Sequence, residues 1–124
     1  MLRVLVVDDD ADVRKFIRVC LTDAGYSVVE AENGLIALQI LREDKVDLIL
    51  CDLFMPDQEG LETIRIIRAT GSDVPIIAIS GMIKYGSFLP AAKSLGASAV
   101  LQKPISVDQL LSAVAEFNQP APLA

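Results

Sequence analysis

The sequence predicts an α/β fold in which five parallel strands form one doubly wound sheet with helices on both faces. Short apolar runs alternate five times with stretches whose apolar residues recur at helical spacing, and this alternation is typical of parallel sheets. The strand-like runs are apolar throughout rather than at every second position, as expected for strands buried on both faces. With 124 residues, the chain has the length of a single domain.

The first half of the chain predicts three strands and two helices. An apolar stripe that includes Phe16 lies between Asp10, which can cap a helix, and Gly25, which can end one. Asn33 is a suitable cap for a second helix. The expected elements are a strand at 4–7, a helix at 11–24, a strand at 27–30, a helix at 34–44 and a strand at 47–51.

The second half predicts three helices and two further strands after a loop over residues 52–60. Gly71 closes the third helix, Pro90 lies in the first turn of the fourth, and Ser106 caps the fifth. The expected elements are a helix at 61–70, a strand at 75–79, a helix at about 88–95, a strand at 97–102 and a helix at 107–117.

The composition excludes several classes of protein. The chain has no histidine, which excludes an imidazole metal ligand and catalysis by a histidine-activated serine or cysteine. A net charge of −6 and a pI near 4.5 argue against nucleic acid and anionic membranes as partners. Cys20 and Cys51 form no CxxC pair and are expected to be core residues in a reducing compartment. No apolar run approaches the roughly 18 residues of a membrane span and no signal-peptide pattern is found, so we expect a cytoplasmic protein.

Polar side chains follow four of the five predicted strands. Ligands bind at the carboxyl ends of strands in open α/β sheets, and this sequence places there Asp8, Asp9, Asp52, Ser80 and Lys103. Three carboxylates and one lysine leave an excess of negative charge, which a hard divalent cation such as Mg²⁺ would compensate. Such a site can accept a phosphoryl group, and a carboxylate that attacks phosphorus forms an aspartyl phosphate.

Four motifs at these strand ends resemble the receiver domain of two-component response regulators, in particular the single-domain regulators of chemotaxis. They are VLVVDDD (4–10), ILCDLFMPD (49–57), IIAISG (76–81) and LQKP (101–104). The resemblance covers residues 2–117 and implies the flavodoxin-like strand order 2-1-3-4-5. It also implies a receiver domain over residues 1–118, followed at 119–124 by a polar, proline-containing tail or the start of a linker.

The resemblance implies a role for each acidic residue at the site. Asp52 matches the phosphoacceptor, which takes a phosphoryl group from a histidine kinase or a histidine phosphotransfer protein. Asp8 and Asp9 match the acidic pair that holds Mg²⁺, while Asp52 and the backbone carbonyl of Phe54 match its other protein ligands. Considered alone, Asp8 or Asp9 could equally be a helix cap.

The resemblance also implies roles for residues near the acceptor. Lys103 matches the lysine that pairs first with the acceptor carboxylate and then with the phosphoryl oxygens, and Ser80 matches the switch hydroxyl. Pro104 matches a proline that usually follows a cis bond, and Gly60 matches the glycine that opens the third helix. The chain departs from many receivers at Val100, where an aliphatic side chain cannot repeat the rotamer change of the usual aromatic residue.

These observations predict a phosphorylation-dependent signalling switch rather than an enzyme, with no catalysis beyond its own phosphoryl transfer and slow autodephosphorylation. Phosphorylation is expected to alter partner binding through the face formed by the fourth helix, the fifth strand and the fifth helix. Three alternatives stay open: a degenerate receiver that acts as a phosphorylation-independent interaction module, a small phosphohydrolase of the haloacid-dehalogenase type, and a flavodoxin-like nucleotide binder. The sequence identifies neither the kinase, nor the output partner, nor the oligomeric state.

Overall fold

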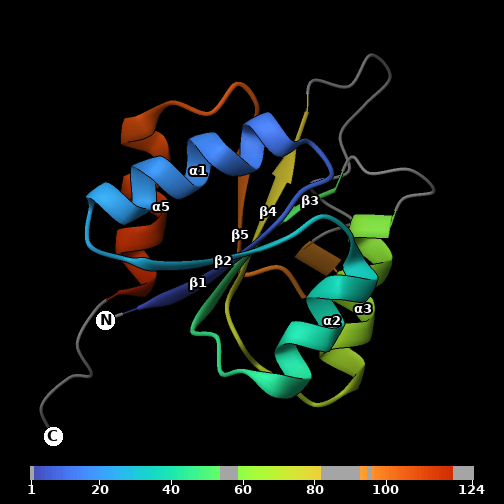
Figure 1. The fold of residues 1–124 in the computed structure, drawn as a ribbon. Helices are drawn as coiled ribbons and strands as arrows, with labels where there is room; N and C mark the ends of the chain where they lie inside the picture. Colours follow the sequence, from blue (N-terminus) through green and yellow to red (C-terminus); the bar gives the residue numbers. More distant parts are fainter. Residues whose placement is uncertain (1, 54–58, 82–92, 95, 119–124) are drawn as a thin grey trace, which may run out of the picture.

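A single parallel sheet of five strands forms the centre of the molecule in the computed structural model, which describes residues 2–53, 59–81, 93–94 and 96–118. The strands lie in the order β2-β1-β3-β4-β5, as predicted (Figure 1). Every pairing between neighbours is parallel. The strands are β1 (Arg3–Val7), β2 (Ser27–Ala31), β3 (Leu48–Asp52), β4 (Ile76–Ser80) and β5 (Ala99–Gln102).

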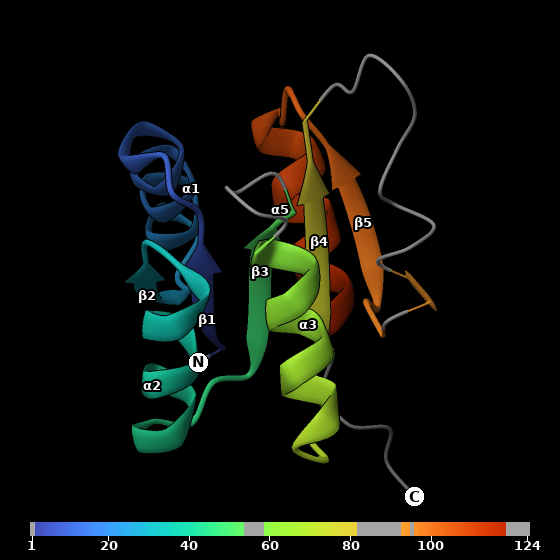
Figure 2. The same ribbon diagram turned by 90° about the vertical axis from the view of Figure 1, so that its right-hand side faces the viewer.

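Helices cover both faces of the sheet (Figure 1, Figure 2). On one face lie α1 (Ala11–Asp23) and α5 (Val107–Phe117), and on the other lie α2 (Gly34–Glu43) and α3 (Glu59–Ala69). Two buried apolar clusters, one on each face, fill the space between the sheet and these helices. The predicted doubly wound architecture is therefore confirmed.

Successive residues of the central strands contribute to opposite clusters. In β1, Val4 and Val6 pack toward α1 and α5, whereas Leu5 and Val7 pack toward α2 and α3. All of these side chains are at most 1% exposed. Because both faces are covered, both sets of positions are apolar, which explains the unbroken apolar runs in the sequence.

The helix caps that the sequence predicts are present. The Asp10 side chain accepts hydrogen bonds from the backbone N–H groups of Asp12 and Val13 at the start of α1. Asn33 accepts one from the N–H of Ile36 at the start of α2, at 2.9 Å. Ser106 forms a capping box at the start of α5. These contacts join residues within three positions of one another, so a short sequence pattern is sufficient to predict them.

Several predicted boundaries were wrong by one or two residues. The strand predicted at 47–51 ends at Asp52, because Asp52 pairs with Ile79 and the N–H of Leu53 donates to the Ile79 carbonyl. The third helix starts at Glu59 instead of following a loop that reaches residue 60. The last strand starts at Ala99 instead of 97. Both strand boundaries depend on pairing with β4, which is distant in the sequence.

The predicted apolar stripe of α1 was wrong at Phe16, which is not buried. Ile17 and Leu21 of that stripe are fully buried, but Phe16 is 40% exposed and lies at the border between the core and solvent. The predicted helix at 88–95 falls mostly outside the described residues, of which Lys93 and Ser94 are helical. The predicted tail at 119–124 also lies outside them. Among the described residues, no helix is long and apolar enough to cross a bilayer.

Candidate functional site

Three carboxylates meet at the carboxyl edge of the sheet. Asp8 follows β1 directly, Asp9 comes next, and Asp52 is the last residue of β3. One carboxylate oxygen from each residue lies within 4.8 Å of the others. Asp8 and Asp52 are buried, whereas Asp9 is exposed. The structure thus brings together the three acidic side chains that the sequence predicted to converge.

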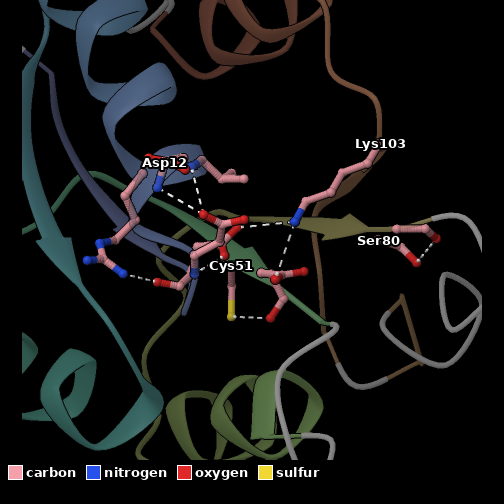
Figure 3. Close-up of polar contacts among 10 residues, drawn as sticks. Asp12, Cys51, Ser80 and Lys103 are labelled. Carbon is pink, nitrogen blue, oxygen red and sulfur yellow. Dashed lines mark hydrogen bonds and ion pairs between the residues drawn. The ribbon is translucent and has the colours of Figure 1, made fainter.

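Lys103 joins the two buried carboxylates. Its Nζ lies 3.3 Å from Oδ2 of Asp8 and 3.5 Å from Oδ2 of Asp52, and Figure 3 shows the side chain extending toward them. The backbone N–H of Lys103 donates to the Ser80 carbonyl at 2.7 Å, which fixes the lysine beside the end of β4. The Lys103–Pro104 bond is cis, as predicted.

Burial and neighbouring charges shift the pKa values of Asp8 and Lys103. Burial raises the pKa of the Asp8 carboxyl from 3.8 to about 6, and repulsion from Asp52 acts in the same direction. The N–H of Asp10, which donates to Oδ1 of Asp8 at 2.8 Å, and the nearby Lys103 oppose this rise. Burial alone would lower the pKa of Lys103, but attraction to Asp52 and Asp8 outweighs it and raises that pKa. The lysine therefore stays protonated at neutral pH.

Ser80 lies at the predicted position, buried at the end of β4. Its hydroxyl donates to the carbonyl of Gly81 at 3.1 Å (Figure 3). Phe54, whose carbonyl was expected to bind the metal, lies outside the described residues. Val100 is half-buried in β5 and packs against the cluster beneath α2 and α3.

Cys51 and Gly60 lie directly behind the acidic site. Cys51 is buried, and its Sγ lies 3.7 Å from the Asp52 carbonyl and 3.9 Å from the Gly60 carbonyl (Figure 3). Its predicted place in the core is confirmed. A Cβ at residue 60 would lie 2.1 Å from the Asp52 carbonyl oxygen and 2.6 Å from the Cα of Leu53. The first turn of α3 thus packs so closely on the end of β3 that only glycine fits there.

Arg14 contacts the site and pairs with Glu30, and no pattern in the sequence points to either residue. Nη1 of Arg14 donates to the backbone carbonyl of Asp8 at 2.6 Å, and Nε of Arg14 lies 3.3 Å from Oε1 of Glu30. Arg14 belongs to the polar side of α1, where an arginine at helical spacing is indistinguishable from a solvated one. No short-range pattern shows that it reaches back to Asp8.

The cluster has the chemistry of a divalent-cation site. When ionised, the three carboxylates carry a charge of −3 and Lys103 returns +1, which leaves −2. Carboxylate oxygens are the ligands that Mg²⁺ prefers, and Mg²⁺ retains several waters when it binds only a few protein groups. Asp9 is exposed, so its carboxylate is accessible to such waters. The residues present therefore fit Mg²⁺.

An apolar groove of about 590 Å³ opens beside Lys103. Val13 and Phe16 of α1 line one side, and Pro104 and Ile105 line the other. The groove therefore lies next to the acidic cluster, because Lys103 also lines it.

A family model and the curated relatives of this chain indicate the same protein family. A family model described as the response regulator receiver domain matches residues 4–115. The response regulator MprA of Mycobacterium avium (strain 104) is 38% identical over 111 residues, which are 90% of this chain and 48% of that protein. The chain thus spans about half the length of the curated relatives it matches.

Solved structures show the same similarity. The receiver domain of the Francisella response regulator 1452 superposes with a TM-score of 0.86 at 27% identity and covers 94% of this chain and 96% of that one. The response regulator TrrA from Thermotoga maritima, solved in complex with Mg(2+)-BeF, has a TM-score of 0.83 at 32% identity. That match covers 94% of this chain and 99% of TrrA.

Proposed function

This chain belongs to the response regulator receiver domain family, and on that premise we propose that Asp52 accepts a phosphoryl group from a histidine kinase or a histidine phosphotransfer protein. Receiver domains are signalling domains of two-component systems and not metabolic enzymes. The family membership argues against the phosphohydrolase and the nucleotide binder. The proposal assigns the switch to residues 1–118.

The arrangement of Lys103 is the observation that carries this proposal. Its ammonium group lies between the buried carboxylates of Asp8 and Asp52, and the Asp9 carboxylate completes the cluster. A cation held by a strand end beside a buried carboxylate stabilises negative charge that arrives at that carboxylate. This arrangement supports a phosphoryl group on one of the two buried carboxylates, and the match of residues 49–57 to the family's acceptor motif selects Asp52.

The transfer is a displacement at phosphorus. An Oδ lone pair of Asp52 forms the new O–P bond while the P–N bond of the donor phosphohistidine breaks, and the leaving imidazole keeps that electron pair. Mg²⁺, held by Asp8, Asp9, Asp52 and the Phe54 carbonyl, would neutralise the phosphoryl oxygens. The Mg(2+)-BeF complex of TrrA supports a cation at this site. The apolar groove beside Lys103 supplies a docking surface for the donor protein.

The new charge then changes the surroundings of Asp52. An aspartyl phosphate carries nearly two negative charges where the carboxylate carried one, and this added charge attracts the ammonium group of Lys103. The Ser80 hydroxyl, which donates to the Gly81 carbonyl, turns to donate to a phosphoryl oxygen. This movement at the end of β4 alters the face that includes β5 and α5 and so changes partner binding. Val100 moves with β5 as an aliphatic packing residue and undergoes no ring flip.

Intact-mass spectrometry tests the proposal. We expect the protein to gain one phosphoryl group when incubated with acetyl phosphate and Mg²⁺, and to gain none when Mg²⁺ is removed with EDTA. Asp52→Asn should gain none under either condition, because an amide oxygen is a much weaker nucleophile than a carboxylate. Slow loss of the added mass after removal of the donor would show autodephosphorylation.

The alternative of a degenerate receiver makes the opposite prediction. Such a module would show neither the mass gain nor Mg²⁺ binding. A mass gain that persists in Asp52→Asn would place the modification elsewhere and contradict the assignment of the acceptor.

A further inference from the structure

We propose that Arg14 is a positioning residue of the acidic site: it holds the backbone carbonyl of Asp8 and thereby orients the carboxylates for a divalent cation. This inference rests on the metal site of the proposed function. It assigns a role to a side chain of α1 that hydrogen-bonds to the backbone of the site and is not part of the cluster formed by the carboxylates and Lys103.

The Asp8 carbonyl lies just beyond the last residue of β1. The final paired residue of that strand is Val7, which lies opposite Ala31 of β2 and Cys51 of β3. The N–H of Asp8 still donates to the Ala31 carbonyl at 3.1 Å. Its carbonyl accepts a hydrogen bond from Nη1 of Arg14 at 2.6 Å. Beyond the last paired residue of β1, the partner of this backbone group is therefore a guanidinium group. Hydrogen bonds with a charged donor are about twice as strong as neutral ones.

Glu30 fixes the arginine in turn. Its Oε1 lies 3.3 Å from Nε of Arg14, and its Oε2 lies 3.1 Å from Nη1 of Arg18. The two arginines are four residues apart on α1, but the side chain of Arg14 is 16% exposed and that of Arg18 is 46% exposed. In the part of the chain that the structure describes, Arg14 bonds to Asp8, whereas Arg18 contacts only Glu30.

The carbonyl of Asp8 and the N–H of Asp9 belong to one planar peptide unit. A hydrogen bond that fixes the carbonyl therefore also fixes the direction in which Asp9 leaves β1. The Asp8 carboxylate is held separately, by the N–H of Asp10 at 2.8 Å and by Lys103 at 3.3 Å. Arg14 thus controls the peptide between the two acidic residues, and without it their mutual orientation is lost. Groups that orient metal ligands in this way typically change metal affinity 10–100-fold when they are removed.

The direction in which the affinity for Mg²⁺ changes distinguishes a positioning role of Arg14 from an effect of its charge. Arg14 is a cation near a cation site, so its removal would by electrostatics alone tighten the binding of Mg²⁺. Arg14→Gln and Arg18→Gln remove the same charge from the same helix, and each removes one partner of Glu30. The hydrogen bond to the Asp8 carbonyl distinguishes the two variants.

Isothermal titration of the full chain with Mg²⁺ at pH 7.5 tests the inference. We expect Arg14→Gln to bind Mg²⁺ about tenfold more weakly than the wild type. We expect Arg18→Gln to stay within about twofold of the wild type, because it removes charge but no contact with Asp8. Unfolding in EDTA gives the second measurement: a general structural role of the Glu30 pairs would lower the stability of both variants without separating their metal affinities.

The outcomes distinguish this inference from the proposed function. If the wild type fails to bind Mg²⁺, the metal site is overturned, and the positioning role with it. If the wild type binds and Arg14→Gln binds within twofold of it, the inference alone is overturned. Should Arg14→Gln fail to fold, Arg14→Met with Arg18→Met as its control replaces the pair under the same criteria, since methionine fills a partly buried position without donating a hydrogen bond.

Discussion

Asp8 is a buried acid whose protonation depends on folding. Burial, and then repulsion from Asp52, raise its pKa from 3.8 to about 6. Between these two pH values the folded protein binds more protons than the unfolded chain does. The free energy of unfolding of the metal-free protein therefore decreases as the pH rises through this window, and the loss is complete above pH 6.

Asp8→Asn should stabilise the metal-free protein at pH 7.5. A shift of this size corresponds to roughly 3 kcal/mol, and the weaker contact of asparagine with Lys103 reduces the net gain to about 2 kcal/mol. The gain should disappear at about pH 4, where Asp8 is already protonated. Urea unfolding in EDTA at the two pH values measures it.

Asp9→Asn is the matched control for this prediction. Asp9 carries the same charge one residue away but is exposed, so its replacement should change the free energy of unfolding by less than about 0.5 kcal/mol. A loss of stability in Asp8→Asn at both pH values would contradict the assignment of Asp8 as a buried, strained charge.

The acidic residues were predictable from the sequence, whereas Arg14 was not. Asp8, Asp52 and Lys103 each follow a recognisable strand, and parallel strands must bring their carboxyl ends to one edge. Arg14 acts through a flexible side chain that reaches back six residues to a backbone carbonyl. The direction of a long side chain depends on its surroundings in the folded protein, and helical periodicity does not contain that information.

Behind the site, the first turn of α3 packs directly on the end of β3. Gly60 in the first turn of α3 lies against the backbone of Asp52 and Leu53. This contact fixes Asp52, the last residue of β3 and the proposed acceptor, relative to the helix. The sequence predicted a glycine at the entrance of the third helix, but only the structure shows that its missing side chain makes room for the Asp52 carbonyl.

Gly60→Ala should destabilise the protein by about 3 kcal/mol, because the added methyl group forces β3 and α3 apart. The sign is informative, since alanine in an unobstructed helix would stabilise by up to about 1 kcal/mol. Urea unfolding measures the change. Gly81→Ala serves as the control, because a Cβ there meets nothing within 4 Å among the described residues and should have little effect. A stabilised Gly60→Ala variant would show that the two elements separate easily.

Helix starts are set by local contacts, whereas strand ends are set by pairing with distant strands. Helix starts at Asp10, Asn33 and Ser106 were predictable because each cap bonds to an N–H within three residues. The end of β3 at Asp52 was not predictable, because it depends on hydrogen bonds to β4. Tertiary hydrogen bonds decide where a strand ends, and a local apolar run only indicates that a strand exists.

At the scale of the whole molecule, the negative charge of the site opposes folding. The acidic cluster retains a charge of −2 after pairing with Lys103, and much of it is buried. A ligand that binds only the folded state raises stability according to its concentration relative to its dissociation constant. Binding of Mg²⁺ at the proposed site would therefore be coupled to folding.

Mg²⁺ at about 100 times its dissociation constant should stabilise the wild type by about 2.7 kcal/mol. For a chain of this length, we expect a rise in Tm of roughly 10 °C, reversed by EDTA. Scanning calorimetry measures it, and NaCl at the same ionic strength controls for general screening. Equal shifts with NaCl and Mg²⁺ would show that the cluster binds no specific cation.

Lys103 and Asp8 are 95 residues apart in the chain, yet their side chains meet. Lys103 follows β5, so it lies beside Asp8 and Asp52 only when β1, β3, β4 and β5 are all paired in one sheet. A nascent or partly unfolded chain carries all the acidic residues but lacks the lysine beside them. Phosphorylation of Asp52, as proposed, would therefore require the complete fold of the sheet.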